Sequence, residues 1–204
     1  MHSNLTPGIA GPGDRFPIHK ALARAALITT PLALAMAAVL LLMGRSAWCR
    51  CGRLSVWSWD IWSSHNSQHL VDPYFFTHVL HGVLFCGLLY WLPQFITSWW
   101  KFSIALALEC GWELLENSPI IIDRYRTATF ALDYYGDSAA NSVVDVLACA
   151  MGYGFAVTAG RGKSVALVLI SELLMTLTIR DCLALNLLML VYPVEAIKQW
   201  QLGG

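Results

Sequence analysis

The sequence predicts an all-α protein, a polytopic transmembrane helical bundle of five to six spans. Hydrophobic residues make up 57% of the 204 residues and charged residues 13%, with a mean hydropathy of +0.56. This composition excludes an ordinary soluble domain or a disordered chain. Several apolar runs approach the ~20 residues that cross a bilayer core as a helix, and none shows the ~10-residue alternation of a barrel strand. The net charge of zero offers no basic surface for nucleic acid.

The predicted elements follow in chain order. Residues 1–20, rich in Gly, Pro and small polar groups, predict a flexible tail. The run 21–43 is too long for a signal-peptide core and is followed by no small-residue cleavage site, so it predicts a retained anchor. Further spans are predicted at 77–96, 100–117, 138–159 and 164–180. The segment 183–191 is short and ends before Pro193, so it is either a last span extended by 194–200 or an interfacial helix.

Residues 21–204 are therefore predicted to form a single transmembrane domain with two external loops, 45–76 and 118–137. The first loop carries Trp48, Trp57, Trp59 and Trp62, which suit the headgroup layer of a membrane. Basic residues are balanced between the two sides, but those opposite the tail are interleaved with aspartates and fit a site. We therefore place the N-terminal tail in the cytoplasm and the two loops outside.

Ionisable residues within the apolar runs, together with one asparagine, lie toward the side of these loops. They are His78 and His81, then Glu109, Glu113 and Glu116, then Asn141 and Asp145, and last Glu172, with Arg180 and Asp181 at the end of its run. Because successive spans alternate in direction, these positions meet at one face and predict a polar centre built from four helices. A charge at the middle of a span costs about 2.5–3.5 kcal/mol. The carboxylates must therefore be protonated, wetted by a cavity, bound to metal, or paired with Arg124, Arg126 and Arg180.

The two histidines have the spacing i, i+3 at the start of a span. With a carboxylate from a facing helix, His78 and His81 would complete a nitrogen–oxygen site for a divalent metal. The alternative is a hydrogen-bonded histidine pair without an ion. His65 and His69 are spaced i, i+4, but their polar neighbours predict a loop rather than a helical site.

The six cysteines fall into two groups. Cys86, Cys110 and Cys149 lie within apolar runs and are interpreted as small buried hydrophobic residues. Cys49, Cys51 and Cys182 lie on the loop side, and in an oxidising compartment Cys182 is able to pair with one of the other two. The Cys-x-Cys spacing alone lacks the partner pair of a zinc site.

Three classes of function remain open, and whether the protein is an enzyme is one of the open questions. The first is an external site that binds or modifies an amphiphilic, lipid-linked envelope substrate. In it Glu113, Asp145 and Glu109 are the candidate catalytic acids and bases, and the candidate substrate-binding residues are Arg124, Arg126, Asp133, Asp137, Asn141 and Glu116. The second is a non-catalytic assembly or regulatory factor that binds an envelope protein. The third, a small proton-coupled transporter, is disfavoured because the cytoplasmic half of the spans is nearly bare of polar groups.

Several segments resemble one family of bacterial membrane proteins. They are Asn66 to His69, Trp112 to Asn117, Ile121 to Arg126, Leu132 to Ser138, Asn141-Ser142 with Asp145, Ile179 to Asp181 and Pro193 to Trp200. The chain is similar over about residues 48–200 to the family known as domain of unknown function 2585, the UPF0314 group. This resemblance implies a multi-pass protein of the bacterial inner (plasma) membrane, and it supplies no activity or cofactor.

A weaker resemblance is to the VanZ-like envelope proteins. Their pattern of Glu, Arg, Asp and Asn bridging two spans is similar to Glu113, Arg126, Asp137 and Asn141. The chain departs from that pattern where a glycine is expected, because Val144-Asp145 follows instead.

Overall fold

The computed structural model describes residues 18–131 and 134–203. In these residues it contains eight α-helices and no strand, only an isolated bridge between Trp57 and Val71. The helices are α1 (Ile18–Leu42), α2 (Phe75–Leu89), α3 (Ser98–Glu116), α4 (Pro119–Ala128), α5 (Ala139–Ala159), α6 (Arg161–Ile179), α7 (Leu183–Val191) and α8 (Glu195–Leu202). The all-α prediction is confirmed. Of the predicted tail, residues 1–17 lie outside the described residues, and α1 begins at Ile18.

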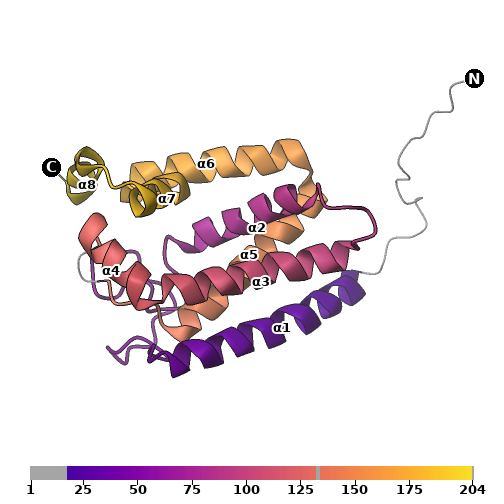
Figure 1. Cartoon of the computed structure of the whole chain (residues 1–204), viewed down its shortest axis with the longest axis horizontal. Helices are drawn as coiled ribbons and strands as arrows, with labels where there is room; N and C mark the ends of the chain where they lie inside the picture. Colours follow the sequence, from indigo (N-terminus) through magenta and orange to yellow (C-terminus); the bar gives the residue numbers. More distant parts are fainter. Residues whose placement is uncertain (1–17, 132–133, 204) are drawn as a thin grey trace, which may run out of the picture.

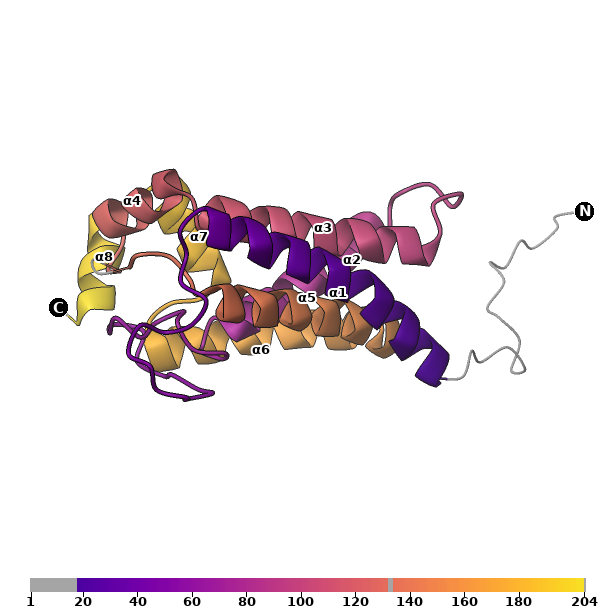
Figure 2. The same ribbon diagram turned by 90° about the horizontal axis from the view of Figure 1, so that it is seen from below.

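Five long helices, α1, α2, α3, α5 and α6, run side by side along the long axis of the molecule in alternating directions (Figure 1). The short helices α4, α7 and α8 gather at one end, together with the loop 43–74, and the start of α1 lies at the opposite end (Figure 2). The ends of α3 and α6 and the starts of α2 and α5 consequently meet at the end that carries the short helices.

Three of these helices, α1, α5 and α6, are long and apolar enough to cross a membrane. The count of five to six spans stays a prediction for two reasons. Helix α2 has 15 residues, and because Tyr90 and Trp91 turn ahead of Pro93 it ends well before the predicted limit at residue 96. Helix α3 has 19 residues but carries Lys101 and three glutamates.

Helices α2 and α5 make the most extensive contact in the bundle, and two glycines allow their backbones to approach. A Cβ atom on Gly82 of α2 would overlap with the carbonyl oxygen of Cys149. A Cβ atom on Gly152 of α5 would overlap with the carbonyl oxygen of Val79. Small residues at the contact of two membrane helices permit such close packing. This contact fixes the start of α2 against the start of α5, where the polar residues lie.

Two segments differ from the sequence prediction. Residues 119–128, expected as part of a loop, form α4, which begins with Pro119 and is capped by Ser118, whose hydroxyl accepts from Ile121 N at 3.5 Å. The alternative of one last span through 183–200 is wrong, because residues 192–194 are not helical and separate α7 from α8. Ser138 caps α5 as expected, accepting from Asn141 N at 3.1 Å.

Candidate functional site

His78 is the centre of a buried polar cluster drawn from three helices. It lies in the first turn of α2, and its Nδ1 is 2.6 Å from Glu109 Oε1 and 3.3 Å from Glu113 Oε1, both on α3. Its Nε2 is 3.9 Å from Asp145 Oδ2 on α5. The i, i+4 spacing of the glutamates places both on one face of α3, so one imidazole contacts carboxylates through both ring nitrogens.

His81 extends the cluster from the next turn of α2. Its Nδ1 is 3.0 Å from Glu109 Oε2 and donates to the same carboxylate that His78 contacts. Glu109 has no exposed surface, so the two imidazoles take the place of its lost hydration. The i, i+3 spacing of the histidines, noted in the sequence, is what allows both rings to face Glu109.

Glu113 is buried in this cluster without a hydrogen-bond partner. Both of its carboxylate oxygens are fully buried and lack one, and its shortest polar contact is the 3.3 Å approach to His78. A buried carboxylate without a partner is costly, so Glu113 must be protonated or must meet a water molecule or an ion.

The donor atoms of this cluster fit a metal ion. Two ligand sets share His78: one adds His81 and Glu109, and the other adds Glu113 and Asp145. In each set the candidate ligand atoms lie within 4.8 Å of one another. Imidazole nitrogen and carboxylate oxygen together suit zinc, manganese or ferrous iron, and an ion would satisfy the free oxygens of Glu113.

A polar cavity of about 50 Å³ lies beside the cluster, toward the end of the molecule that carries α4, α7 and α8. Of the predicted site residues, it is lined by His78, His81, Glu116, Asp137, Asn141 and Asp145. A water needs roughly 10–15 Å³ of such space, so the cavity has room for a few waters or a small polar group. Glu109 and Glu113 do not line it.

A ring of tyrosines and aspartates surrounds the cavity. Tyr125 OH donates to Glu116 at 2.9 Å, and Tyr134 OH donates to Asp137 at 2.9 Å. Tyr74 OH donates to Asp181 at 2.9 Å. The sequence gives no signal for these tyrosines, because a tyrosine in a predicted loop belongs to no spacing pattern.

Asp72, also missed, orders the start of α2. Its carboxylate accepts from Tyr74 N at 2.7 Å and from Ser67 N at 3.1 Å, and Asn141 Nδ2 lies 3.5 Å away. An aspartate followed by proline just before an apolar run is a helix-start signal, so the sequence did contain a way to find it.

Burial raises the pKa values of two carboxyl groups near the cavity, Asp72 and Asp181, to about 6. Asp137 adds to the effect at Asp72 through its negative charge. In an unfolded chain an aspartate titrates near pH 4, so folding favours the protonated forms. Their contribution to stability is complete below about pH 4 and is lost as the pH rises through 6.

We therefore expect the free energy of unfolding in detergent to fall as the pH rises from 4 to 7. Asp181→Asn is expected to weaken that dependence, because asparagine stays neutral at every pH. Thermal unfolding followed by circular dichroism at several pH values measures both slopes. A variant as pH-dependent as the wild type would show that other groups govern the titration.

The arginines do not pair with the buried carboxylates. Within the described part of the chain, every ion pair joins a histidine to a carboxylate. Arg124 donates to the carbonyl oxygens of Leu190 and Val191, and Arg180 donates to that of Trp200. The expectation of an arginine ion-pair network is therefore wrong: these side chains instead tie α4 and α6 to the C-terminal helices.

Two further predicted residues lie apart from the cluster. Glu172 on α6 accepts from the backbone N–H groups of Leu183 and Ala184 at 3.0 and 2.9 Å, so it caps the start of α7. The polar centre therefore draws on three helices rather than four. Arg126 donates to the carbonyl oxygen of Tyr134 and lines a separate groove. Asp133 lies outside the described residues.

All six cysteines are free thiols. Cys182 packs with Ile61, Phe130, Met175 and Ile179 in an apolar cluster, whereas Cys49 contacts Cys51. Cys110 and Cys149 are buried in the main core, as their apolar surroundings predicted.

Comparison with known proteins places the chain in a family. Residues 40–203 match the family described as "Protein of unknown function (DUF2585)". The chain belongs to this family. The curated relatives of this DUF2585 protein are called UPF0314 proteins. One from Sphingopyxis alaskensis is 46% identical over 87% of this chain and 95% of that protein, and one from Rhizobium etli is 50% identical over 80% and 83%.

A third relative, from Paracoccus denitrificans, is 44% identical over 84% of this chain and 90% of that protein. No solved structure matches the DUF2585 protein. The resemblance to VanZ-like proteins is not supported by these matches, which all lie within the UPF0314 group. Its function must therefore be argued from the site.

Proposed function

We propose that this DUF2585 protein holds a divalent cation in its helical bundle and binds the polar headgroup of an amphiphilic, lipid-linked substrate beside it. The ligands in this proposal are His78, His81, Glu109, Glu113 and Asp145, and the membrane is the bacterial inner membrane. The observation that carries the proposal is Glu113, a buried carboxylate with two unsatisfied oxygens that faces an imidazole.

The charges of the cluster favour a cation. Three carboxylates, Glu109, Glu113 and Asp145, surround two histidines, so the group stays negative even with both imidazoles protonated. No arginine or lysine within the described residues contacts these carboxylates, and apolar helices surround them. A bound divalent ion supplies the missing positive charge and replaces hydration at the same time.

The two acids Glu113 and Asp145 lie differently relative to the cavity. Asp145 reaches both the cavity and His78 Nε2, whereas Glu113 contacts His78 away from the cavity. We therefore assign ion binding to Glu113, and contact with the substrate and any proton transfer to Asp145.

A groove of about 290 Å³ next to the cavity suits an anionic headgroup. It is lined by Arg45, Arg50 and Arg126, and it shares Asp137 with the cavity. Guanidinium groups bind phosphate and carboxylate through paired hydrogen bonds. In this proposal Arg126 binds the headgroup, as the sequence suggested, together with Arg45 and Arg50 from the first loop.

Aromatic side chains at the two ends of the bundle support its place in a bilayer. Trp57, Trp59 and Trp62 are exposed at the cavity end, and Trp91 and Trp100 are exposed at the other. Tryptophan favours the headgroup layers on both sides of a membrane. Arg24, Lys101 and Arg161 accompany the second group, with Arg24 over Trp99 and Arg161 over Tyr90, which favours the cytoplasm for that end and the outside for the cavity.

Metal content tests the proposal. In full-length protein purified without chelator, elemental mass spectrometry is expected to find about one divalent ion fewer in Glu113→Gln than in the wild type. Glu195→Gln makes the same change at an exposed carboxylate and should retain the ion. Glu113→Gln also removes an unpaired buried charge, so this variant is expected to be at least as stable as the wild type after chelation.

Folded protein with the same metal content in wild type and Glu113→Gln would refute the ion site. Native mass spectrometry of the same samples tests whether the protein binds a lipid with an anionic headgroup. Anionic lipid that is retained by wild type and lost in Arg126→Gln supports the arginine groove, whereas a stoichiometric protein partner in place of lipid would favour an assembly factor.

A further inference from the structure

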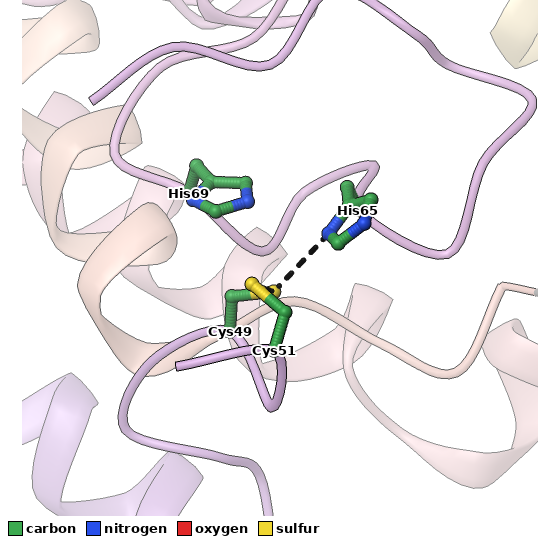
Figure 3. A group of neighbouring side chains, drawn as sticks. All are labelled: Cys49, Cys51, His65 and His69. Carbon is green, nitrogen blue, oxygen red and sulfur yellow. Dashed lines mark hydrogen bonds between the residues drawn. The ribbon is translucent and has the colours of Figure 1, made fainter. Parts of the chain in front are cut away.

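A second group of ligand-type side chains lies in the loop between α1 and α2 (Figure 3). Cys49 and Cys51 come from the start of this loop and face His65 and His69 from its far part. One ligand atom of each residue lies within 4.8 Å of the others. Cys49 Sγ is 3.0 Å from Cys51 Sγ and 3.4 Å from His65 Nδ1.

We propose that these four residues, the loop cluster, bind a zinc ion. Two thiolates and two imidazoles form the donor set of a closed tetrahedral zinc site. The order of the ligands along the chain is also that of a zinc site: Cys-x-Cys comes first, residues 52–64 follow, and His-x-x-x-His comes last. The intervening segment has the length usual for such sites, about 12–15 residues, although one residue rather than two separates the cysteines.

Backbone hydrogen bonds favour the metal-binding forms of two of the ligands, His69 and Cys51. His69 Nδ1 lies 2.9 Å from the carbonyl oxygen of Ser55, and because a carbonyl only accepts, this nitrogen carries the proton. Nε2 of His69 is then left with its lone pair free for a metal. The backbone N–H of Arg53 lies 3.4 Å from Cys51 Sγ and stabilises negative charge on the sulfur.

The sulfur atoms need only a small movement to become ligands. Their separation of 3.0 Å is too long for a disulfide bond of about 2.05 Å. It is shorter than the ~3.8 Å between two thiolates that each lie ~2.3 Å from a tetrahedral zinc ion. Cys49 and His69 are buried and held in place, while Cys51 is exposed, so a side-chain rotation of Cys51 supplies the difference.

The loop is long and has little regular structure. Residues 43–74 contain no helix, and the bridge between Trp57 and Val71 is their one ladder contact. Ordered loops longer than about 12–15 residues without secondary structure of their own are uncommon and usually have a function. A zinc ion would join residues 49–51 to 65–69. Next to His69, Gln68 donates to the carbonyl oxygen of Gly136 at 2.6 Å, and Ser67 lines the polar cavity.

Zinc in the loop cluster would therefore fix the segment that covers the cavity. This inference does not depend on the proposed function, because the loop cluster shares no ligand with the His78 cluster and contains the sulfur ligands that the latter lacks.

The full-length protein, purified in detergent without chelator, is expected to contain zinc that is lost in Cys49→Ser and in His69→Ala. Cys86→Ser, a thiol change outside the loop, and Glu113→Gln are both expected to retain it. Replacement of the zinc by cobalt should give thiolate-to-cobalt absorption in the near ultraviolet, which carboxylate and imidazole ligands alone do not produce. A zinc content that is the same in Cys49→Ser as in the wild type would refute the site.

Maleimide labelling of the wild type is independent of how the variants fold. Because Cys51 is exposed, it should react quickly after zinc removal and at least ten times more slowly once zinc is restored. Equal labelling rates with and without zinc would overturn the proposal. So would a Cys49–Cys51 disulfide, found by peptide mass in freshly isolated, unreduced protein.

Discussion

His78→Ala is expected to lower the free energy of unfolding of metal-free protein by about 3–5 kcal/mol. The imidazole contacts Glu109 and Glu113 through one nitrogen and Asp145 through the other. Without it three buried carboxylates would face one another, and removing one partner of a buried charge pair is far more costly than losing a surface pair. Denaturant unfolding in detergent, with a chelator present, measures the loss.

His81→Ala is the matched control for this change. The one carboxylate that His81 contacts among the described residues is Glu109, and its ring packs against Phe85 and Trp112 at the edge of the cluster. We expect it to cost about 1–2 kcal/mol, the range of one hydrogen bond to a charged group. If the two variants lose equal stability, His78 does not have the central role that its contacts indicate.

Gly82→Ala and Gly152→Ala are each expected to destabilise the protein by about 1–3 kcal/mol. The added methyl group of either variant would overlap with a backbone carbonyl oxygen of the facing helix, which has no rotamer by which to move away. Helices α2 and α5 must then separate, and His78 moves away from Asp145. The melting temperature in detergent and the metal content are expected to fall together.

Two other helical glycines provide the controls for this pair. A Cβ atom on Gly87 of α2 or on Gly154 of α5 would have no neighbour within 4 Å. Alanine at these positions is expected to be neutral or to stabilise the helix by about 0.5–1 kcal/mol. Destabilisation equal to that of Gly82→Ala would mean that the α2–α5 contact does not limit stability.

The helices themselves were largely predictable, because each depends on apolar length and on local start and stop signals. The start of α5 after Ser138 and the break near Pro193 follow from capping and from the geometry of proline. Helix α4 was missed because its sequence is mixed in polarity and short. Its start signal, Ser118 followed by Pro119, was nevertheless present in the sequence.

The candidate site was predicted in part. His78, His81, Glu109, Glu113 and Asp145 come together because helix periodicity and alternating direction are properties of the sequence order. Arg124, Arg180 and Glu172 were expected to join them and did not. A long polar side chain near the end of a helix bonds to the unpaired backbone groups that lie within its reach. Which groups those are depends on where the next helix packs.

By itself, the sequence determined that this is an all-α chain with membrane-length helices and a polar end, because hydrophobic length and periodicity are local quantities. Only the tertiary structure decided that Glu113 lacks a partner and that Cys49 meets His65 across the loop. Both depend on side chains distant in sequence approaching within a few ångströms, and that approach is set by packing such as the contact of Gly82 with α5 rather than by spacing along the chain.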